Sequence, residues 1–215
     1  MRVDKREPVF LVLEAYWEKD IEDDSTVRPF VKGLCDAYGW EYFHRFFDSA
    51  DDIRLWIREF DHTRRPGCQK IVYIAAHGSS GFLHTIETKI PASRLLSIIA
   101  HTRSLTGVHL GSCNLAKQRF SRKLLKSSNV KWVAAYRREI PWLESMALDL
   151  LFWNWVFSGV PRTKRSVRLS PARAASEMYS GFGLARDMGF QVVHRKRGTR
   201  KVESSWEILK TKGDK

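Results

Sequence analysis

Two apolar segments decide the fold of this chain: IVYIAAHG at residues 71–78 and GVHLGSC at residues 107–113. Each is short and bounded by turn-forming residues, which is typical of a buried β-strand rather than of a solitary helix. Between them, residues 90–102 have helical spacing, and Pro91 stands in a first-turn position. A strand, a helix and a second strand predict a right-handed crossover between parallel strands.

His77 and Cys113 stand at the ends of these two strands. If the strands are direct neighbours, they lie about 4.8 Å apart, and both residues emerge at the carboxyl edge of the sheet. Open α/β sheets place their ligand sites at this edge. A thiol next to an imidazole can be deprotonated into a strong nucleophile. The sequence therefore predicts a site built on His77 and Cys113.

This arrangement resembles the caspase-like cysteine peptidases, whose signature is a hydrophobic strand ending in His-Gly and a later one ending in a small residue and Cys. The resemblance covers roughly residues 8–186, and its specific part is the two segments and their order. It implies an α/β fold, a three-layer α/β/α sandwich with a mainly parallel caspase-like sheet. The later part is most similar to a CHAT-type domain, on a strand at 131–136, a helix at 144–157 after Ile140-Pro141-Trp142, and a helix opening at Ser170.

The resemblance also implies the chemistry of the site. The thiolate of Cys113 would attack a peptide carbonyl, and His77 would protonate the leaving amine. The backbone amides of Gly78 and Cys113 would form the oxyanion hole. Glycine at position 78 fits this role because substrate backbone must approach closely there. The resemblance supplies no fixed third catalytic residue.

Two loops, at residues 14–24 and 136–142, are implied to contact the substrate residue before the scissile bond. The predicted substrate-binding residues are Glu14, Asp20, Tyr136, Arg137 and Trp142. The acidic first loop suits a Lys or Arg side chain. The arginines of the second loop suit Asp or Glu instead. The acids of the first loop are equally explained as a solvated loop before a helix start. We favour a basic substrate residue only slightly over an acidic one.

Length and composition fit one domain over residues 1–215, with a basic C-terminal extension from about residue 187. The chain is 43% hydrophobic and 12% aromatic, which argues against disorder. No run reaches transmembrane length and no signal peptide is recognisable, so we expect no membrane association. Three cysteines without framework spacing favour a reducing, cytoplasmic compartment. No metal-ligand spacing is present, so no metal or other cofactor is predicted.

The net charge of +13 is unevenly distributed, and residues 117–138 contain no acidic side chain. Such a field favours polyanions or acidic partner surfaces, although a solvated basic face explains it as well. No nucleic-acid-binding motif accompanies the charge, so a nucleic-acid partner would rest on charge alone.

Three functions remain open at this point. The first is a cysteine endopeptidase that cleaves a protein substrate, as implied by the resemblance to CHAT-type proteins of bacterial, including antiviral, defence or regulated death. It would be activated by a separate protein or by self-cleavage in the basic segment 161–168. The second is a glutaminase-like amidotransferase, which Leu115 opposes because it replaces the second glycine of a G-x-C-x-G elbow. The third is an inactive caspase-like module that docks an acidic protein or nucleic acid through its basic half.

Overall fold

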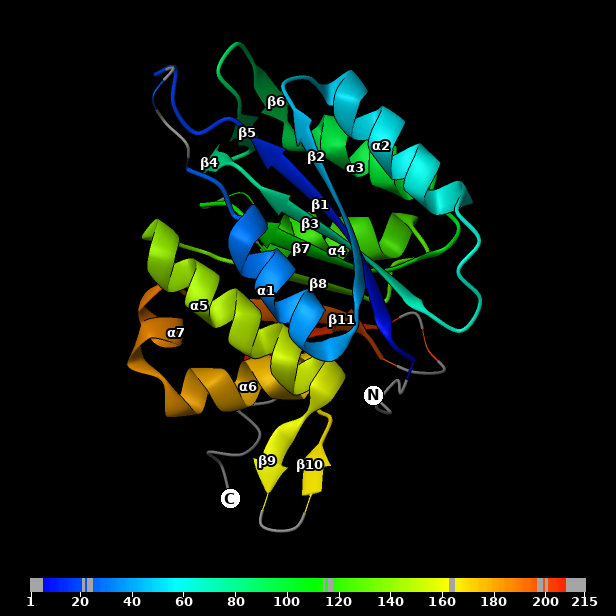
Figure 1. The fold of residues 1–215 in the computed structure, drawn as a ribbon, viewed down its shortest axis with the longest axis vertical. Coiled ribbons are helices and arrows are strands. Elements are labelled where there is room, and N and C mark those ends of the chain that lie inside the picture. The colour runs from blue at the N-terminus through cyan, green and yellow to red at the C-terminus, as the bar shows by residue number, and fades with distance from the viewer. Residues whose placement is uncertain are drawn as a thin grey trace.

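A seven-stranded sheet forms the middle layer of the protein (Figure 1). The computed structural model describes residues 6–20, 22, 25–113, 115, 118–162, 165–196, 199 and 201–207. The strands, in sheet order, are β12 (Val202–Ser204), β11 (Gln191–Arg195), β8 (Trp132–Ala135), β7 (Leu105–Gly111), β3 (Gln69–Ala75), β1 (Pro8–Ala15) and β2 (Glu41–Phe47). Neighbours from β8 to β2 are parallel, whereas β11 and β12 add antiparallel strands at one edge. The mainly parallel sheet predicted from the sequence is confirmed.

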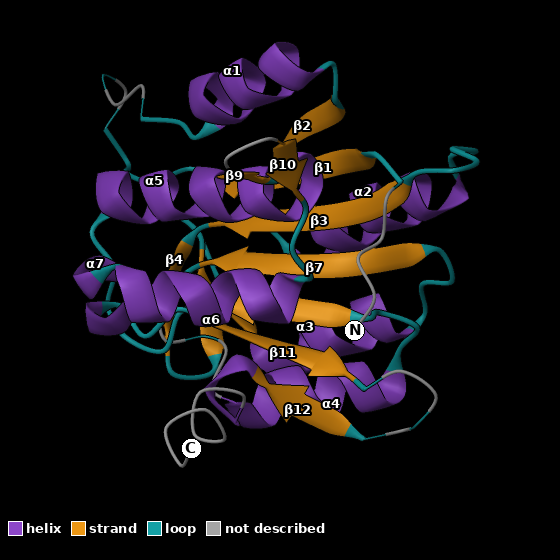
Figure 2. Ribbon diagram, turned by 90° about the horizontal axis from the view of Figure 1, so that it is seen from below, coloured by secondary structure: helices purple, strands orange, loops and turns teal. Residues whose placement is uncertain are grey.

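Helices cover both faces of this sheet, which completes the predicted three-layer sandwich (Figure 2). One face carries α2 (Ala50–His62), α3 (Ala92–Ala100) and α4 (Gln118–Ser127). The other carries α1 (Arg28–Tyr38), α5 (Trp142–Trp153) with its π-helical continuation η1 (Asn154–Ser158), α6 (Pro171–Gly181) and the short α7 (Gly183–Asp187).

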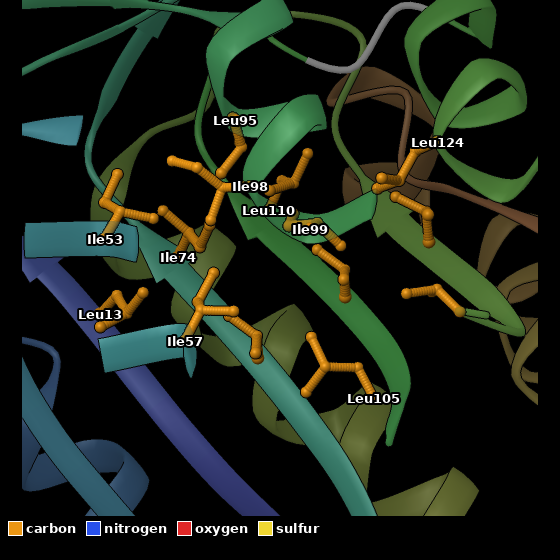
Figure 3. Packing of buried hydrophobic residues seen from close by; sticks show 14 of the residues in the cluster. Leu13, Ile53, Ile57, Ile74, Leu95, Ile98, Ile99, Leu105, Leu110 and Leu124 are labelled. Atoms are coloured by element: carbon orange, nitrogen blue, oxygen red, sulfur yellow. The ribbon is translucent and has the colours of Figure 1, made fainter. Parts of the chain in front are cut away.

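The apolar positions of the helices and strands explain this layering. On α2, Ile53 and Ile57 lie one turn apart and face Leu13 and Ile74 of the sheet (Figure 3). Both isoleucines are fully or nearly fully buried. Removing such a side chain from water contributes about 1.5–3 kcal/mol of stability. The inner strands β1, β3, β7 and β8 are buried along their whole length because helices cover both faces, as expected for parallel sheets.

Local sequence signals set most helix ends. Ser49 begins α2 with a capping box, in which its hydroxyl accepts from the amide of Asp52 and the Asp52 carboxylate accepts from the amide of Ser49. Gly39 ends α1 in the left-handed conformation at φ 67°, which glycine adopts without strain. The N-cap of α1 is Val27, whose amide donates to the side chain of Glu14.

The two basic segments near the C-terminus form ordered structure in the described residues. β9 (Val160–Arg162) and β10 (Arg165–Val167) pair as an antiparallel hairpin within the segment considered for self-cleavage. Beyond residue 187, β11 and β12 join the central sheet, so the predicted extension contributes two of its strands. Along the described part of the chain, no helix combines the length and the apolar character needed to cross a bilayer.

A polar cluster lies inside the sandwich, between the sheet and α5. The carboxylate of Asp149 accepts from the hydroxyls of Tyr73 at 2.8 Å and Tyr136 at 2.6 Å. His109 accepts from the indole of Trp153 through Nδ1, and its Nε2 lies 2.8 Å from Asp149 at an angle too oblique for a straight hydrogen bond. Burial, together with Asp149, raises the pKa of both tyrosines well above the usual value. The cluster joins β3, β7 and the end of β8 to α5.

Candidate active site

The strands that carry His77 and Cys113 are direct neighbours. β3 and β7 pair in parallel, with Ala75 opposite Gly111. Cys113 follows β7 by two residues, in the turn toward α4. His77 follows β3 by two residues and opens a short strand, β4 (His77–Ser79), that the sequence does not predict. Both side chains therefore leave the sheet at the same carboxyl edge, as the register of the two strands requires.

β4 belongs to a small three-stranded sheet with β5 (Phe82–His84) and β6 (Lys89–Pro91), at one end of the molecule (Figure 1). This sheet occupies the stretch from the His-Gly segment to α3. His77 lies opposite His84 in the β4–β5 register. Burial, then the charges of Lys89 and His77, lower the pKa of His84, whose Nε2 is 2.7 Å from the hydroxyl of Ser79.

His77 and Cys113 line one pocket of about 240 Å³. His77 is exposed and Cys113 is half-buried. The remaining described residues of the wall are Trp17, Glu18, Ser25, Ala76, Gly111, Ile140, Trp142 and Ser145. In the described structure no hydrogen bond joins His77 to Cys113. Catalytic contacts in ligand-free sites are often loose and tighten when substrate binds.

The loop after β8 holds the sulfur of Cys113. The backbone amide of Ile140 donates to Sγ at 3.3 Å, and the carbonyl of the same residue lies 3.9 Å from Sγ. Both backbone polar groups of Ile140 thus contact the sulfur. This donor is a backbone group, so no residue type in the sequence signals it.

Gly78 is needed where the two strand ends meet. A Cβ at this position would lie 2.4 Å from the carbonyl oxygen and 3.1 Å from the amide nitrogen of Cys113. The sequence analysis explains this glycine by the approach of substrate backbone. The structure gives a different reason, because the group that approaches is the backbone of Cys113 itself. The two amides predicted to form an oxyanion hole therefore belong to adjoining segments.

The predicted substrate-binding residues separate into three groups. Trp142 lines the pocket. Asp20 and Arg137 are exposed outside the described pocket wall, with Arg137 over the ring of Trp206 at 5.4 Å. Glu14 and Tyr136 are fully buried, which corrects the expectation that they touch a substrate side chain. Their carboxylate and hydroxyl are occupied by hydrogen bonds inside the protein.

Trp17 and Glu18 also line the pocket. Both fall within the predicted substrate loop, residues 14–24, but neither is among the residues predicted individually to bind substrate. The indole of Trp17 meets the ring of His77 edge to face, with centroids 5.1 Å apart and planes at 90°. The ring centroid of Trp142 lies 6.5 Å from that of Trp17. An exposed Glu18 adds a carboxylate to the same wall. An exposed acidic residue in a loop belongs to no periodic pattern. The sequence alone therefore could not show that Glu18 lies in the pocket wall.

No protein-family model matches this sequence, and no curated protein matches it. The fold has counterparts among solved structures, and two of these are C11 cysteine proteases. At identities of 9% and 8%, the likeness shows that the fold is shared.

Two of these structures illustrate the match. One is a secreted C11 cysteine protease from Bacteroides thetaiotaomicron in complex with an irreversible peptide inhibitor, with a TM-score of 0.50 and 9% identity over 87% of this chain and 66% of that chain. The other is an inactive zymogen C11 protease from Parabacteroides distasonis, with a TM-score of 0.54 and 8% identity over 97% of this chain and 65% of that chain. This chain therefore spans just under two thirds of their length.

Proposed function

We propose that this protein is a caspase-like cysteine endopeptidase, with Cys113 as nucleophile and His77 as general acid and base. The observation that carries the proposal is that neighbouring parallel strands deliver both residues to the wall of one pocket. The likeness of the fold to C11 cysteine proteases supports it.

The proposed reaction proceeds in two stages. His77 takes the proton of the Cys113 thiol, and the thiolate attacks the peptide carbonyl carbon, while the tetrahedral oxyanion accepts hydrogen bonds from the amides of Gly78 and Cys113. The C–N bond then breaks as the imidazolium of His77 gives its proton to the leaving amine. A water molecule, deprotonated by His77, attacks the thioester, and the C–S bond breaks to release the acid product. The imidazolium returns the proton to the thiolate, which restores Cys113 and His77.

The pocket supports a basic residue before the scissile bond. Glu18 places a carboxylate on the wall, and none of the described lining residues is Lys or Arg. The indoles of Trp17 and Trp142 offer faces on which a cation can rest. Of the two arginines that favour an acidic residue, Arg137 lies against Trp206 and Arg138 donates to the carbonyl of Asp187.

A peptide hydrolysis assay tests activity and preference together. Matched fluorogenic peptides carry Lys, Arg, Asp or Glu before the cleaved bond. We expect cleavage after Lys and Arg, and loss of activity in Cys113→Ala and His77→Ala. Glu18→Gln should raise KM for the basic peptides about tenfold. Asp20→Asn, which removes an acid from the same loop but outside the pocket, is the control. Cleavage only after Asp or Glu would reject the basic preference, and turnover by Cys113→Ala would reject the mechanism.

We further propose a CHAT-type role in bacterial defence or regulated death, in the cytoplasm, with a separate protein as activator. Proteolysis of proteins encoded beside this gene, with Cys113→Ala as control, tests that setting. Self-cleavage in segment 161–168 would require the β9–β10 hairpin to open or to enter another molecule's pocket. Intact masses of wild type and Cys113→Ala that stay equal after incubation would exclude it.

One observation favours the alternative of a docking module. α4 presents Arg119, Lys123 and Lys126 as exposed cations at helical spacing, and its sequence contains no acid. An acidic protein or a nucleic acid would bind such a face with strong salt dependence. Binding to single-stranded DNA and to polyglutamate, measured at two salt concentrations, tests it against a triple charge-reversal variant. A wild type that binds without hydrolysing any peptide would favour docking.

A further inference from the structure

The ring of His77 needs a support, and Trp17 is the aromatic side chain against which it rests. His77 opens β4 and is exposed, so solvent alone would leave its imidazole free to rotate. The edge-to-face contact with Trp17 restricts it, at 5.1 Å between centroids. Aromatic pairs prefer this geometry and gain about 0.5–1.5 kcal/mol from it beyond burial. The orientation of His77 therefore depends on where the indole of Trp17 is held.

Trp17 is held by a carboxylate that is out of contact with solvent. The indole Nε1–H donates to Oε1 of Glu14 at 2.8 Å, and the exposed fraction of Glu14 is 0%. A second donor to Oε1 is the amide of Val27 at 2.7 Å. Oε2 accepts from the hydroxyl of Thr26 at 2.7 Å and from Nε2 of His44 at 2.6 Å.

Four donors fill the acceptor sites of the Glu14 carboxylate. A buried carboxylate is tolerated only when it is paired and hydrogen-bonded, and this one meets that condition completely. Its donors come from β2, from the residues before α1, and from the loop that follows β1. Glu14 therefore fixes the loop after β1 relative to the neighbouring strand and helix. It does not line the described pocket wall, and its direct contact with a residue that touches His77 is the bond from Trp17.

We propose that Trp17, anchored by Glu14 and His44, is the positioning residue for the His77 imidazole. This inference rests on the proposed function of His77 as general acid and base. Trp17 is then the partner that orients His77, a role for which the resemblance supplies no residue. An indole ring fills this role in place of a carboxylate or an amide. A chain of contacts then runs from β2 through Glu14 and Trp17 to His77.

The test separates positioning from simple packing. Trp17→Phe keeps an aromatic ring near His77 but removes the N–H to Glu14, and Glu14→Gln replaces an acceptor by a donor without touching the pocket. Trp40→Phe is the matched control, because it removes an equivalent bond from an indole to Glu7 at 3.0 Å, outside the described pocket wall. Each variant is measured for kcat and KM on the basic peptide and for the rate at which iodoacetamide alkylates Cys113.

We expect Glu14→Gln to lower kcat about 10- to 100-fold with KM changed less than about threefold, because misplacement of a catalytic group affects the transition state. Trp17→Phe should act in the same direction, and Trp40→Phe should leave both constants unchanged. A folded Glu14→Gln with wild-type kcat overturns the proposal. So does a Trp17→Phe variant that raises KM alone, since Trp17 would then be only a pocket wall. If Glu14→Gln does not fold, Trp17→Phe decides alone.

The alkylation rate keeps this proposal separate from the proposed function. If the wild type hydrolyses no peptide, but Cys113 alkylation falls equally in His77→Ala and Glu14→Gln, the positioning role stands and the peptidase function fails. If peptides are hydrolysed and neither Glu14→Gln nor Trp17→Phe changes kcat or the alkylation rate, the function stands and the positioning role fails. An alkylation rate that His77→Ala lowers and Glu14→Gln leaves unchanged also overturns positioning.

Discussion

Replacing Gly78 with alanine tests how closely the two strand ends must approach. The added Cβ would lie 2.4 Å from the carbonyl oxygen of Cys113, whereas ordinary van der Waals contact begins at 3.4 Å. The difference requires the two backbones to separate by about 1 Å, because neither contacting atom belongs to a flexible side chain. A shift of about 1 Å in catalytic geometry reduces rates about 100-fold. Overpacking of this kind costs about 1–3 kcal/mol of folding free energy.

The assay measures both consequences in one protein preparation. For a chain of this size, 1 kcal/mol corresponds to about 2–4 °C in Tm, so a cost of about 2 kcal/mol lowers Tm by about 4–8 °C. The expected kcat/KM on the basic peptide is about 100-fold below wild type. Gly33→Ala is the control, since a Cβ on this exposed residue of α1 meets nothing within 4 Å. Helix propensity alone should make Gly33→Ala more stable by about 0.5–1 kcal/mol.

A Gly78→Ala protein with wild-type Tm and wild-type kcat/KM would refute the reasoning, because the close approach would then be unnecessary. A protein with lowered Tm and full activity would show that the approach stabilises the fold without setting the geometry of the site.

Three further predictions concern the interior and the surface. Asp149→Ala should cost about 3–5 kcal/mol in urea unfolding, because it leaves buried hydroxyls without an acceptor; a cost below about 1 kcal/mol would contradict that role. Burial, with a smaller effect of Asp36, raises the pKa of the Cys35 thiol to about 12, so peptide mapping after iodoacetamide treatment at pH 8 should find Cys113 alkylated and Cys35 intact; equal modification of both would contradict it. Backbone and hydroxyl donors, the amide of Asp48 first, hold the pKa of Asp52 below its usual 3.8. The resulting stability is complete above about pH 4 and is lost as the pH falls through the lowered pKa. Asp52→Asn should therefore show a smaller loss of Tm between pH 6 and pH 3 than wild type, and identical losses would show that the cap carries no charge effect.

The sequence predicts the fold where the signals are local. The apolar runs around residues 71–78 and 107–113 become β3 and β7, with the helix α3 between them, and they pair directly. Ser49 and Gly39 mark helix ends through capping chemistry that acts over a few residues. The antiparallel strands β11 and β12, by contrast, lie in the segment that the sequence analysis treats only as a basic extension, and β11 pairs with β8.

The sequence fails where burial depends on distant partners. Glu14 is predicted to meet substrate, because it falls in the substrate loop that the resemblance implies, residues 14–24. It is buried because donors from residues 26, 27 and 44 converge on it. Tyr136 is buried for the same kind of reason, because its hydroxyl donates to Asp149 of α5. Trp142, predicted from the implied substrate loop at residues 136–142, lies in the wall of the pocket.

The cluster around Asp149 also restricts how this sequence can diverge. Each polar side chain of the cluster has its partner within the cluster: Tyr73, His109, Tyr136 and Trp153. The loss of any one of them leaves a buried polar group without a partner. We therefore expect substitutions at these positions to occur together in homologous proteins. A homologue with leucine at the position of Asp149 should carry phenylalanine in place of both tyrosines, and finding it with both hydroxyls retained would show that the set is not coupled.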